Sequence, residues 1–274
     1  MELLAIAVGE GAIRFSGMQR FYDALAQNGS AFDFRLQLKC VMDSGDIQPE
    51  WAKNADCALV CGAFRGSETL QSLREEAFTL AILNGHDWDP HVRIDSYDAQ
   101  IGRTAAERLF AKGIRKPCLL AYHSKSRRHL LRKLGFQSYW LEEGGALEEI
   151  GELWIDPSCT YSRITELGDA MGELVERHDG IYCLDKYSAV DVINLLSRLD
   201  IAVPSDIKVI STDGTYDSLR TSPKLTFVRQ RFESMAEIAV QTIRSRFSGA
   251  SPSQSPEETH TVLLPGDLVE RESA

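Results

Sequence analysis

The sequence lacks any long apolar run. None of its apolar stretches approaches the about 18 residues that a membrane-spanning helix requires. The N-terminal stretch from Met1 to Phe15 carries an acidic residue where a secretory signal has basic ones, and its first apolar run stops after six residues. We therefore expect neither a membrane segment nor an export signal, and we expect a cytoplasmic location.

Positive charge is also scarce. Lys and Arg number 30 against 40 Asp and Glu, which gives a net charge of −10. Tight nucleic-acid binding by this chain alone is not expected, because such binding depends on neutralising phosphates with Lys and Arg. The six cysteines lie mostly in apolar, strand-like stretches, which is typical of buried, reduced thiols in a cytosolic protein.

Catalytic and cofactor motifs are missing as well. The sequence has no P-loop, no HExxH and no GxSxG pattern. Gly9 and Gly11 hint at a dinucleotide loop, but Arg14 occupies the position of the third glycine. The loop from His86 to His91 gathers two imidazoles and two carboxylates, and we interpret it as a polar turn, with metal binding as the alternative. We therefore expect no cofactor, no metal and no enzymatic activity.

Short apolar runs without polar alternation are abundant, as is typical of parallel strands that are covered on both faces. The runs are LLAIAV (Leu3 to Val8), CALVC (Cys57 to Cys61), FTLAIL (Phe78 to Leu83), PCLLAY (Pro117 to Tyr122), GIYCL (Gly180 to Leu184) and IKVIS (Ile207 to Ser211). Apolar residues at helical spacing separate them. The chain of 274 residues is long enough for about two domains. We predict an α/β fold with two similar, doubly wound parallel-sheet lobes.

Polar residues follow several of these strands, where α/β proteins bind ligands. Arg14 and Phe15 follow the first strand, and Asp95, Asp185 and Asp213 end later ones. Carboxylates accept hydrogens from paired hydroxyls, guanidinium groups donate to hydroxyl or ring oxygens, and aromatic rings cover the apolar face of a sugar. This residue set indicates a site for a small polyhydroxylated molecule.

The sequence from Val92 to the C-terminus resembles the effector-binding domain of the LacI/GalR transcriptional regulators, which has a type I periplasmic-binding-protein fold. The resemblance rests on the segments VRIDSYDAQIGRTAAERLFAKGIRKPCLL, RKLGFQSYWLEEG, DGIYCLDKYSAVDVINLLSRLDIAVPSDIKVISTDG, SPKLTFVRQRFESMAEIAV and LLPGDLVERES. The first 90 residues match more loosely.

The resemblance implies which residues contact the effector. Arg132, just before Leu-Gly-Phe, corresponds to an effector-contacting arginine, and Arg128 lies one helical turn earlier. Asp213 in VISTDG contacts effector hydroxyls in the family, Gln230 in LTFVRQ matches a family glutamine, and Asp185 lies at the pocket edge. Leu184 stands where many relatives have asparagine, and Gly214 replaces a common second aspartate, so the identity of the effector stays open. The sequence also leaves open whether the effector induces or co-represses.

The resemblance also implies the domain boundaries. We expect a first lobe of residues 1–116 with 230–250 and a second lobe of residues 117–229 with 251–274. A three-strand hinge would cross between the lobes near Arg115 to Pro117, Thr226 to Arg229 and Ser248 to Ser253. The effector would lie between the two lobes, and lobe closure would alter DNA binding.

The partners expected from the resemblance are a sugar-type effector and a second copy of the chain. A homodimer would form through first-lobe helices such as Ser16 to Asn28. Operator DNA would bind only through a helix-turn-helix head, which family members usually carry first and this sequence does not contain. A solute-binding protein of a sugar transport system is the alternative function, and it would need the export signal that we do not expect.

Overall fold

The computed structural model describes residues 1–9, 16–30, 35–42, 46–62, 68–83, 88–122, 126–155, 164–214, 221–248 and 259–274. These residues form two compact units. The first comprises Met1–Ser96 and Arg231–Leu264, and the second comprises Tyr97–Gln230 and Pro265–Ala274. The chain therefore passes between the units three times.

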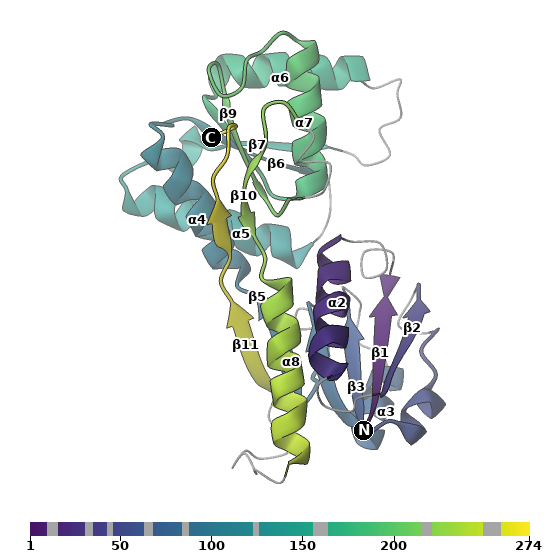
Figure 1. Ribbon diagram of the computed structural model, residues 1–274. Helices are drawn as coiled ribbons and strands as arrows, with labels where there is room; N and C mark the ends of the chain where they lie inside the picture. Colours follow the sequence, from purple (N-terminus) through teal and green to yellow (C-terminus); the bar gives the residue numbers. More distant parts are fainter. Residues whose placement is uncertain are drawn as a thin grey trace. The chain divides into compact units, whose positions relative to one another are not determined.

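The first unit contains a six-stranded, fully parallel sheet in the order β11-β5-β4-β3-β1-β2 (Figure 1). Its strands are β1 (Glu2–Val8), β2 (Arg35–Val41), β3 (Cys57–Cys61), β4 (Phe78–Ile82), β5 (Val92–Ser96) and β11 (His260–Leu264). Among the inner strands, β1, β3 and β4 are mostly apolar because helices cover both faces of the sheet, whereas β5 also carries the buried polar residues Arg93 and Asp95.

Helices α2 (Ser16–Ser30) and α8 (Phe232–Phe247) pack on one face of this sheet, and they lie next to each other. On the other face, α3 (Glu68–Glu76) and the short helix η2 (Pro49–Asn54) complete a second core cluster. Cys57 and Cys61 both face the α2 and α8 side, as expected for strand residues four positions apart.

The second unit repeats this arrangement with the sheet order β12-β10-β9-β8-β6-β7. Its strands are β6 (Pro117–Tyr122), β7 (Gly151–Ile155), β8 (Gly180–Cys183), β9 (Lys208–Thr212), β10 (Thr226–Arg229) and β12 (Asp267–Val269). All neighbours are parallel except β10 and β12, which are antiparallel. Helices α4 (Asp98–Ala111) and α5 (Arg127–Glu142) cover one face, followed by the short η3 (Leu147–Glu149). Helices α6 (Ile164–Arg177) and α7 (Lys186–Arg198) cover the other.

Helices α4 and α5 cross where each has a glycine, Gly102 on α4 and Gly135 on α5. A Cβ atom on Gly102 would overlap the carbonyl oxygen of Arg132, and one on Gly135 would overlap the carbonyl oxygen of Ala99. Only hydrogen atoms fit between the two backbones here. This close approach fixes the position of α5, and with it the backbone of Arg132.

The predicted fold class is confirmed, because both units are doubly wound sheets in which all pairs but β10–β12 are parallel. The predicted strands agree with β1, β3, β4, β6, β8 and β9 to within two residues at either end. The edge strands β2 and β7 were not among the apolar runs, because polar residues alternate with apolar ones along them. None of the described helices has the length and apolar character needed to span a bilayer.

The boundaries between units differ from those we expected. Residues 97–116 belong to the second unit, because α4 packs against α5 and the second sheet. Strand β11 pairs with β5, which places His260–Leu264 in the first unit instead of the second. The crossings therefore lie after Ser96, Gln230 and Leu264. The sequence break at residues 113–117 is a helix-to-strand turn inside the second unit.

Candidate functional site

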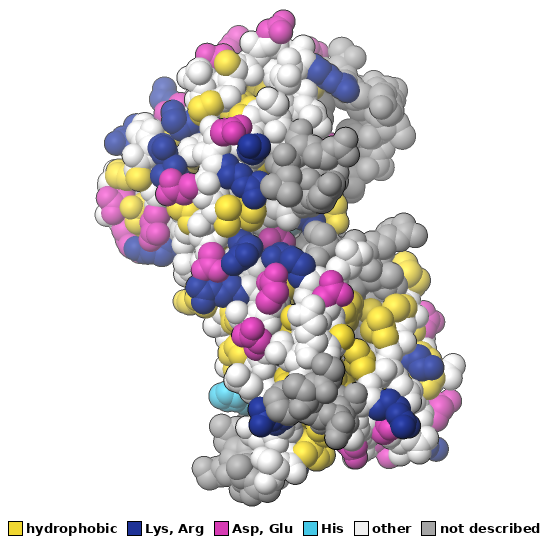
Figure 2. Space-filling model, in the orientation of Figure 1, with side chains coloured by type: hydrophobic (Ala, Val, Ile, Leu, Met, Phe, Trp, Pro, Cys, Tyr) yellow, Lys and Arg dark blue, Asp and Glu magenta, His cyan; other side chains and the backbone are white. Residues whose placement is uncertain are grey.

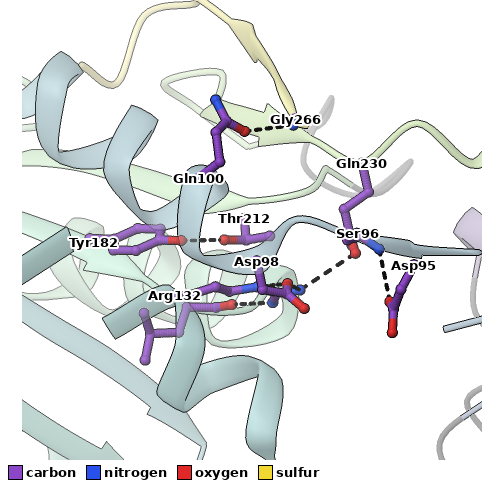
Figure 3. A network of polar contacts seen from close by, with 10 residues as sticks. Asp95, Ser96, Asp98, Gln100, Arg132, Tyr182, Thr212, Gln230 and Gly266 are labelled. Carbon is purple, nitrogen blue, oxygen red and sulfur yellow. Dashed lines mark hydrogen bonds and ion pairs between the residues drawn. The ribbon is translucent and has the colours of Figure 1, made fainter. Parts of the chain in front are cut away.

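Arg132 is the centre of a buried polar cluster in the second unit (Figure 3). It lies on the face of α5 that turns toward α4, next to Gly135 and Phe136, and its side chain is 6% exposed. A buried guanidinium requires a countercharge and hydrogen-bond acceptors. The surrounding elements supply both.

Asp98, the first residue of α4, provides the countercharge. Its Oδ1 lies 2.7 Å from Nε and 2.7 Å from Nη2 of Arg132, and its side chain is 3% exposed. Arg132 Nη1 also donates to the carbonyl oxygen of Leu184 at 2.7 Å, just after β8. The same Nη2 donates to Oε1 of Gln230 at 3.4 Å, a long contact. Arg132 thus joins α5, α4 and the ends of β8 and β10.

The charges of this cluster oppose the effect of burial. Burial favours neutral arginine, but the carboxylates of Asp98 and Asp213 leave the pKa of Arg132 above its usual value. One turn earlier on α5, burial and the neighbouring Arg132 lower the pKa of His129 to about 4, although Asp185 and Asp98 act in the opposite direction. The cluster therefore holds a permanent cation beside a neutral imidazole at neutral pH.

Asp213 follows β9 and is 2% exposed. Its backbone adopts φ +62°, a left-handed conformation that aspartate tolerates better than most residues. Its N–H donates to the carbonyl oxygen of Val228 at 2.8 Å, and its carbonyl accepts from Ser211 Oγ at 3.0 Å. These contacts hold the carboxylate at the end of β9, on the same unit as Arg132.

Asp185 is the N-cap of α7. Its Oδ1 accepts the backbone N–H groups of Tyr187 and Ser188, each at 2.9 Å. Its Oδ2 accepts from Ser188 Oγ at 3.0 Å and from the Tyr122 N–H at 3.4 Å. Capping α7 gives Asp185 a structural role, and its place at a pocket edge stays a prediction.

The remaining predicted site residues are placed as follows. Arg128 is half-buried on the first turn of α5. Arg14 and Phe15 lie outside the described residues. Asp95 belongs to the first unit, so it is not on the same sheet as Asp185 and Asp213. Of the segment His86 to His91, His86 and Asp87 lie outside the described residues and Trp88 is a core residue of the first unit; no metal-ligand cluster occurs among the residues that the structure describes.

Asp98 was not among the site residues predicted from the sequence. An acidic residue in the first turn of a helix is common, because it complements the helix dipole, so nothing along the chain marked this one. Its pairing with Arg132 spans 34 positions and is visible only in the fold. The contact between Tyr182 Oη and Thr212 Oγ1, 2.5 Å long and fully buried on β8 and β9, was missed for the same reason (Figure 3).

This cluster can offer hydrogen-bond donors and acceptors from a rigid frame. Asp98 and Leu184 orient the guanidinium, and the long contact to Gln230 is the part of the network that a ligand oxygen could most readily replace. A fixed guanidinium with a nearby carboxylate suits a neutral, hydroxyl-rich molecule, because each ligand hydroxyl both donates and accepts.

Two doubly wound parallel sheets, linked by three chain crossings, define a protein of the periplasmic-binding-protein-like class. The chain belongs to the periplasmic binding protein-like domain family, whose sequence profile matches residues 106–274. The expected resemblance to the effector-binding domain of LacI-family regulators is confirmed by the repressors and regulators that the chain matches.

The curated relatives that the chain matches include repressors of two kinds of operon. The chain is 28% identical over 155 residues to the sucrose operon repressor of Streptococcus mutans serotype c (strain ATCC 700610 / UA159), a match that covers 56% of this chain and 45% of the repressor. It is 30% identical over 89 residues to the probable opine utilization operon repressor of Rhizobium rhizogenes, covering 32% and 43%. The chain thus spans less than half the length of these relatives.

Solved structures share the fold over the whole chain. A LacI family transcriptional regulator from Weissella paramesenteroides with bound sucrose superposes with a TM-score of 0.79 at 16% identity, covering 100% of this chain and 98% of that one. A transcription regulator from Lactobacillus plantarum superposes with a TM-score of 0.75 at 21% identity, with the same coverage.

Proposed function

We propose that this chain is the effector-sensing part of a transcriptional regulator, that it binds a sugar, and that it acts in the cytoplasm. The observation that carries the proposal is the Arg132 cluster, in which a buried guanidinium is held by Asp98 and Leu184 beside Asp213 and Gln230. The sucrose operon repressor relative and the sucrose-bound regulator structure support a sugar over other small molecules.

Within this proposal, Arg132 and Asp213 contact ligand hydroxyls, and Gln230 releases or shares its hydrogen bond when the ligand arrives. Arg128, Asp185, Arg14 and Phe15 are further proposed contacts. Because Arg132 joins α4, α5 and the strand ends, a ligand that takes over one of its hydrogen bonds changes the energy of a particular arrangement of this unit. A ligand shifts an equilibrium only through such a difference in affinity.

The proposed partners of the regulator are a second copy of the chain, paired through α2, and operator DNA, bound by a helix-turn-helix head outside this sequence. No catalytic role is proposed, since the relatives are repressors and regulators. The alternative of a transport solute-binding protein shares the fold, but the curated relatives favour the regulator.

The test is isothermal titration calorimetry of the protein with sucrose, glucose, ribose and cellobiose. The sugar that binds most tightly is then titrated into the Asp213→Asn variant. We expect the parent protein to bind one of these sugars, and we expect Asp213→Asn to lower the affinity for that sugar at least tenfold. A protein that binds none of these sugars, or a variant that binds as tightly as the parent, overturns the proposal.

A further inference from the structure

The outer face of α5 carries leucines at the surface. Leu130, Leu134 and Leu141 are 53%, 50% and 50% exposed, on the side of the helix opposite the buried Arg132 and Phe136. Outward-facing positions of a surface helix are normally polar. In Figure 2, hydrophobic side chains reach the surface between basic and acidic ones where α4 and α5 cover the second unit. An apolar stripe of this kind is typical of a contact with another protein surface.

The spacing of the stripe is that of a helix-pairing seam. Arg127, Leu130, Leu134, Gln137 and Leu141 recur at intervals of three and four, the alternation that aligns side chains along one line of a helix facing a partner helix. Helix α5 has 16 residues, so the seam runs along about 24 Å. Its frame is rigid, because Gly102 and Gly135 hold α5 against α4 in close backbone contact.

The charges on α5 are reversed relative to its helix dipole. The first turn carries Arg127 and Arg128 and has no acidic residue, and the last turn ends in Glu142 and has no basic residue. Helices usually have the opposite distribution, with acids at the N-terminus and bases at the C-terminus. An antiparallel partner with the same charge distribution would place its acidic end beside the basic end of α5 and its basic end beside the acidic end.

The helix that meets these requirements is α5 of a second molecule. We propose that two copies of this chain associate through antiparallel α5 helices, related by a two-fold axis. In that register Leu130 of each copy packs near Leu141 of the other, and the Leu134 side chains lie close to the axis. Arg127 of each copy then lies on the same flank as Glu142 of the other, so each contact occurs twice.

Glu142 is suited to this position, because it is exposed and already part of a charged network. It lies 2.7 Å from Nη2 of Arg103, and Arg103 Nε lies 3.2 Å from Glu107. The Arg127 guanidinium of the second copy would join this network and stay in contact with solvent. The α5 contact lies on the second unit and is therefore separate from the dimer proposed through α2 of the first.

The test is sedimentation equilibrium of the protein over a range of concentrations. Leu130→Glu/Leu134→Glu is expected to halve the mass of the largest species, and to raise the dissociation constant of that step at least tenfold. Leu263→Glu, at a position 47% exposed on the first unit, is the matched control and is expected to leave the mass unchanged. Circular dichroism melting of each variant checks that the fold is retained.

A charge exchange identifies the partner as α5 itself. Arg127→Glu alone and Glu142→Arg alone are each expected to weaken association, since each homodimer then meets like charges twice. An equimolar mixture of the two variants, and the double variant, are expected to regain the parental dissociation constant within about threefold, the range of one surface ion pair. Equal masses for the parent and the leucine variant at every concentration overturn the proposal. Weakening in both single variants with no recovery in the mixture overturns the antiparallel α5 pairing.

Discussion

The backbone carbonyl of Arg132 occupies the space that a Cβ atom of residue 102 would need, so the residue that centres the candidate site is positioned by a glycine on another helix. Gly135 makes the reciprocal contact with Ala99. The site and the packing of α4 on α5 are therefore one structural feature, and a change at the crossing acts on both.

We expect Gly102→Ala to lower the free energy of unfolding by about 1–3 kcal/mol, because an added methyl group forces the two helices apart. Urea unfolding measures the change. Gly172→Ala on α6 is the matched control: nothing lies within 4 Å of the added Cβ, and replacing a helical glycine there should stabilise by about 0.5–1 kcal/mol. If both variants respond alike, the close crossing is not a structural constraint.

Asp98→Asn removes the countercharge from a buried guanidinium. The expected loss is about 3–5 kcal/mol in the free energy of unfolding, because Arg132 stays charged in a dry environment. Glu107→Gln, which breaks the exposed pair with Arg103, should cost no more than about 1 kcal/mol. Chemical denaturation of both variants compares the two ion pairs directly. Similar losses in the free energy of unfolding would contradict the burial of the Asp98–Arg132 pair.

His129 should make stability depend on pH. Its folded pKa of about 4 lies below its ordinary value of 6.5, so between these values the unfolded chain binds a proton that the folded chain does not. Stability from this residue is present above pH 6.5 and is lost as the pH falls to 4, by about 1–2 kcal/mol for a partly solvated side chain. Unfolding curves of the parent and His129→Gln should converge or cross as the pH falls through this window. A constant difference between them contradicts the lowered pKa.

Variants of Asp185 separate its role as the N-cap of α7 from its proposed contact with the ligand. Asp185→Ala should destabilise by about 1–2 kcal/mol through loss of the α7 cap, whereas Asp185→Asn keeps a capping oxygen and should cost less. Thermal unfolding ranks the variants. Calorimetry on the stable Asp185→Asn variant then shows whether the carboxylate contacts the sugar: a loss of affinity supports its place at the site, and unchanged affinity limits it to capping.

The apolar strands were predictable because burial on both sheet faces leaves a run such as CALVC without polar interruption. The edge strand β2, RLQLKCV, alternates polar and apolar residues, since most of it is exposed, and it therefore contains no apolar run that would indicate a strand. The unit boundaries depended on β11 pairing with β5 across 168 positions, counted from Val92 to His260, which no local pattern reveals.

The candidate site was partly predictable for a similar reason. Arg132 and Gln230 were identified through the motifs around them, and the structure brings them together. Asp98 was not identified, because its role arises from the α4 and α5 crossing and not from its neighbours along the chain. Asp185 shows the reverse case, in which a residue noted for ligand chemistry also has a full capping role.

Sugar binding at the Arg132 cluster is best measured by calorimetric titration of the intact chain with sucrose and glucose, with Asp213→Asn as the site variant and Glu107→Gln as the surface control. We expect saturable binding of a sugar that Glu107→Gln retains and that Asp213→Asn weakens about 10- to 100-fold, the range for losing a charged hydrogen bond. Equal affinity in all three proteins, or no sugar binding by the parent, would contradict the proposed site.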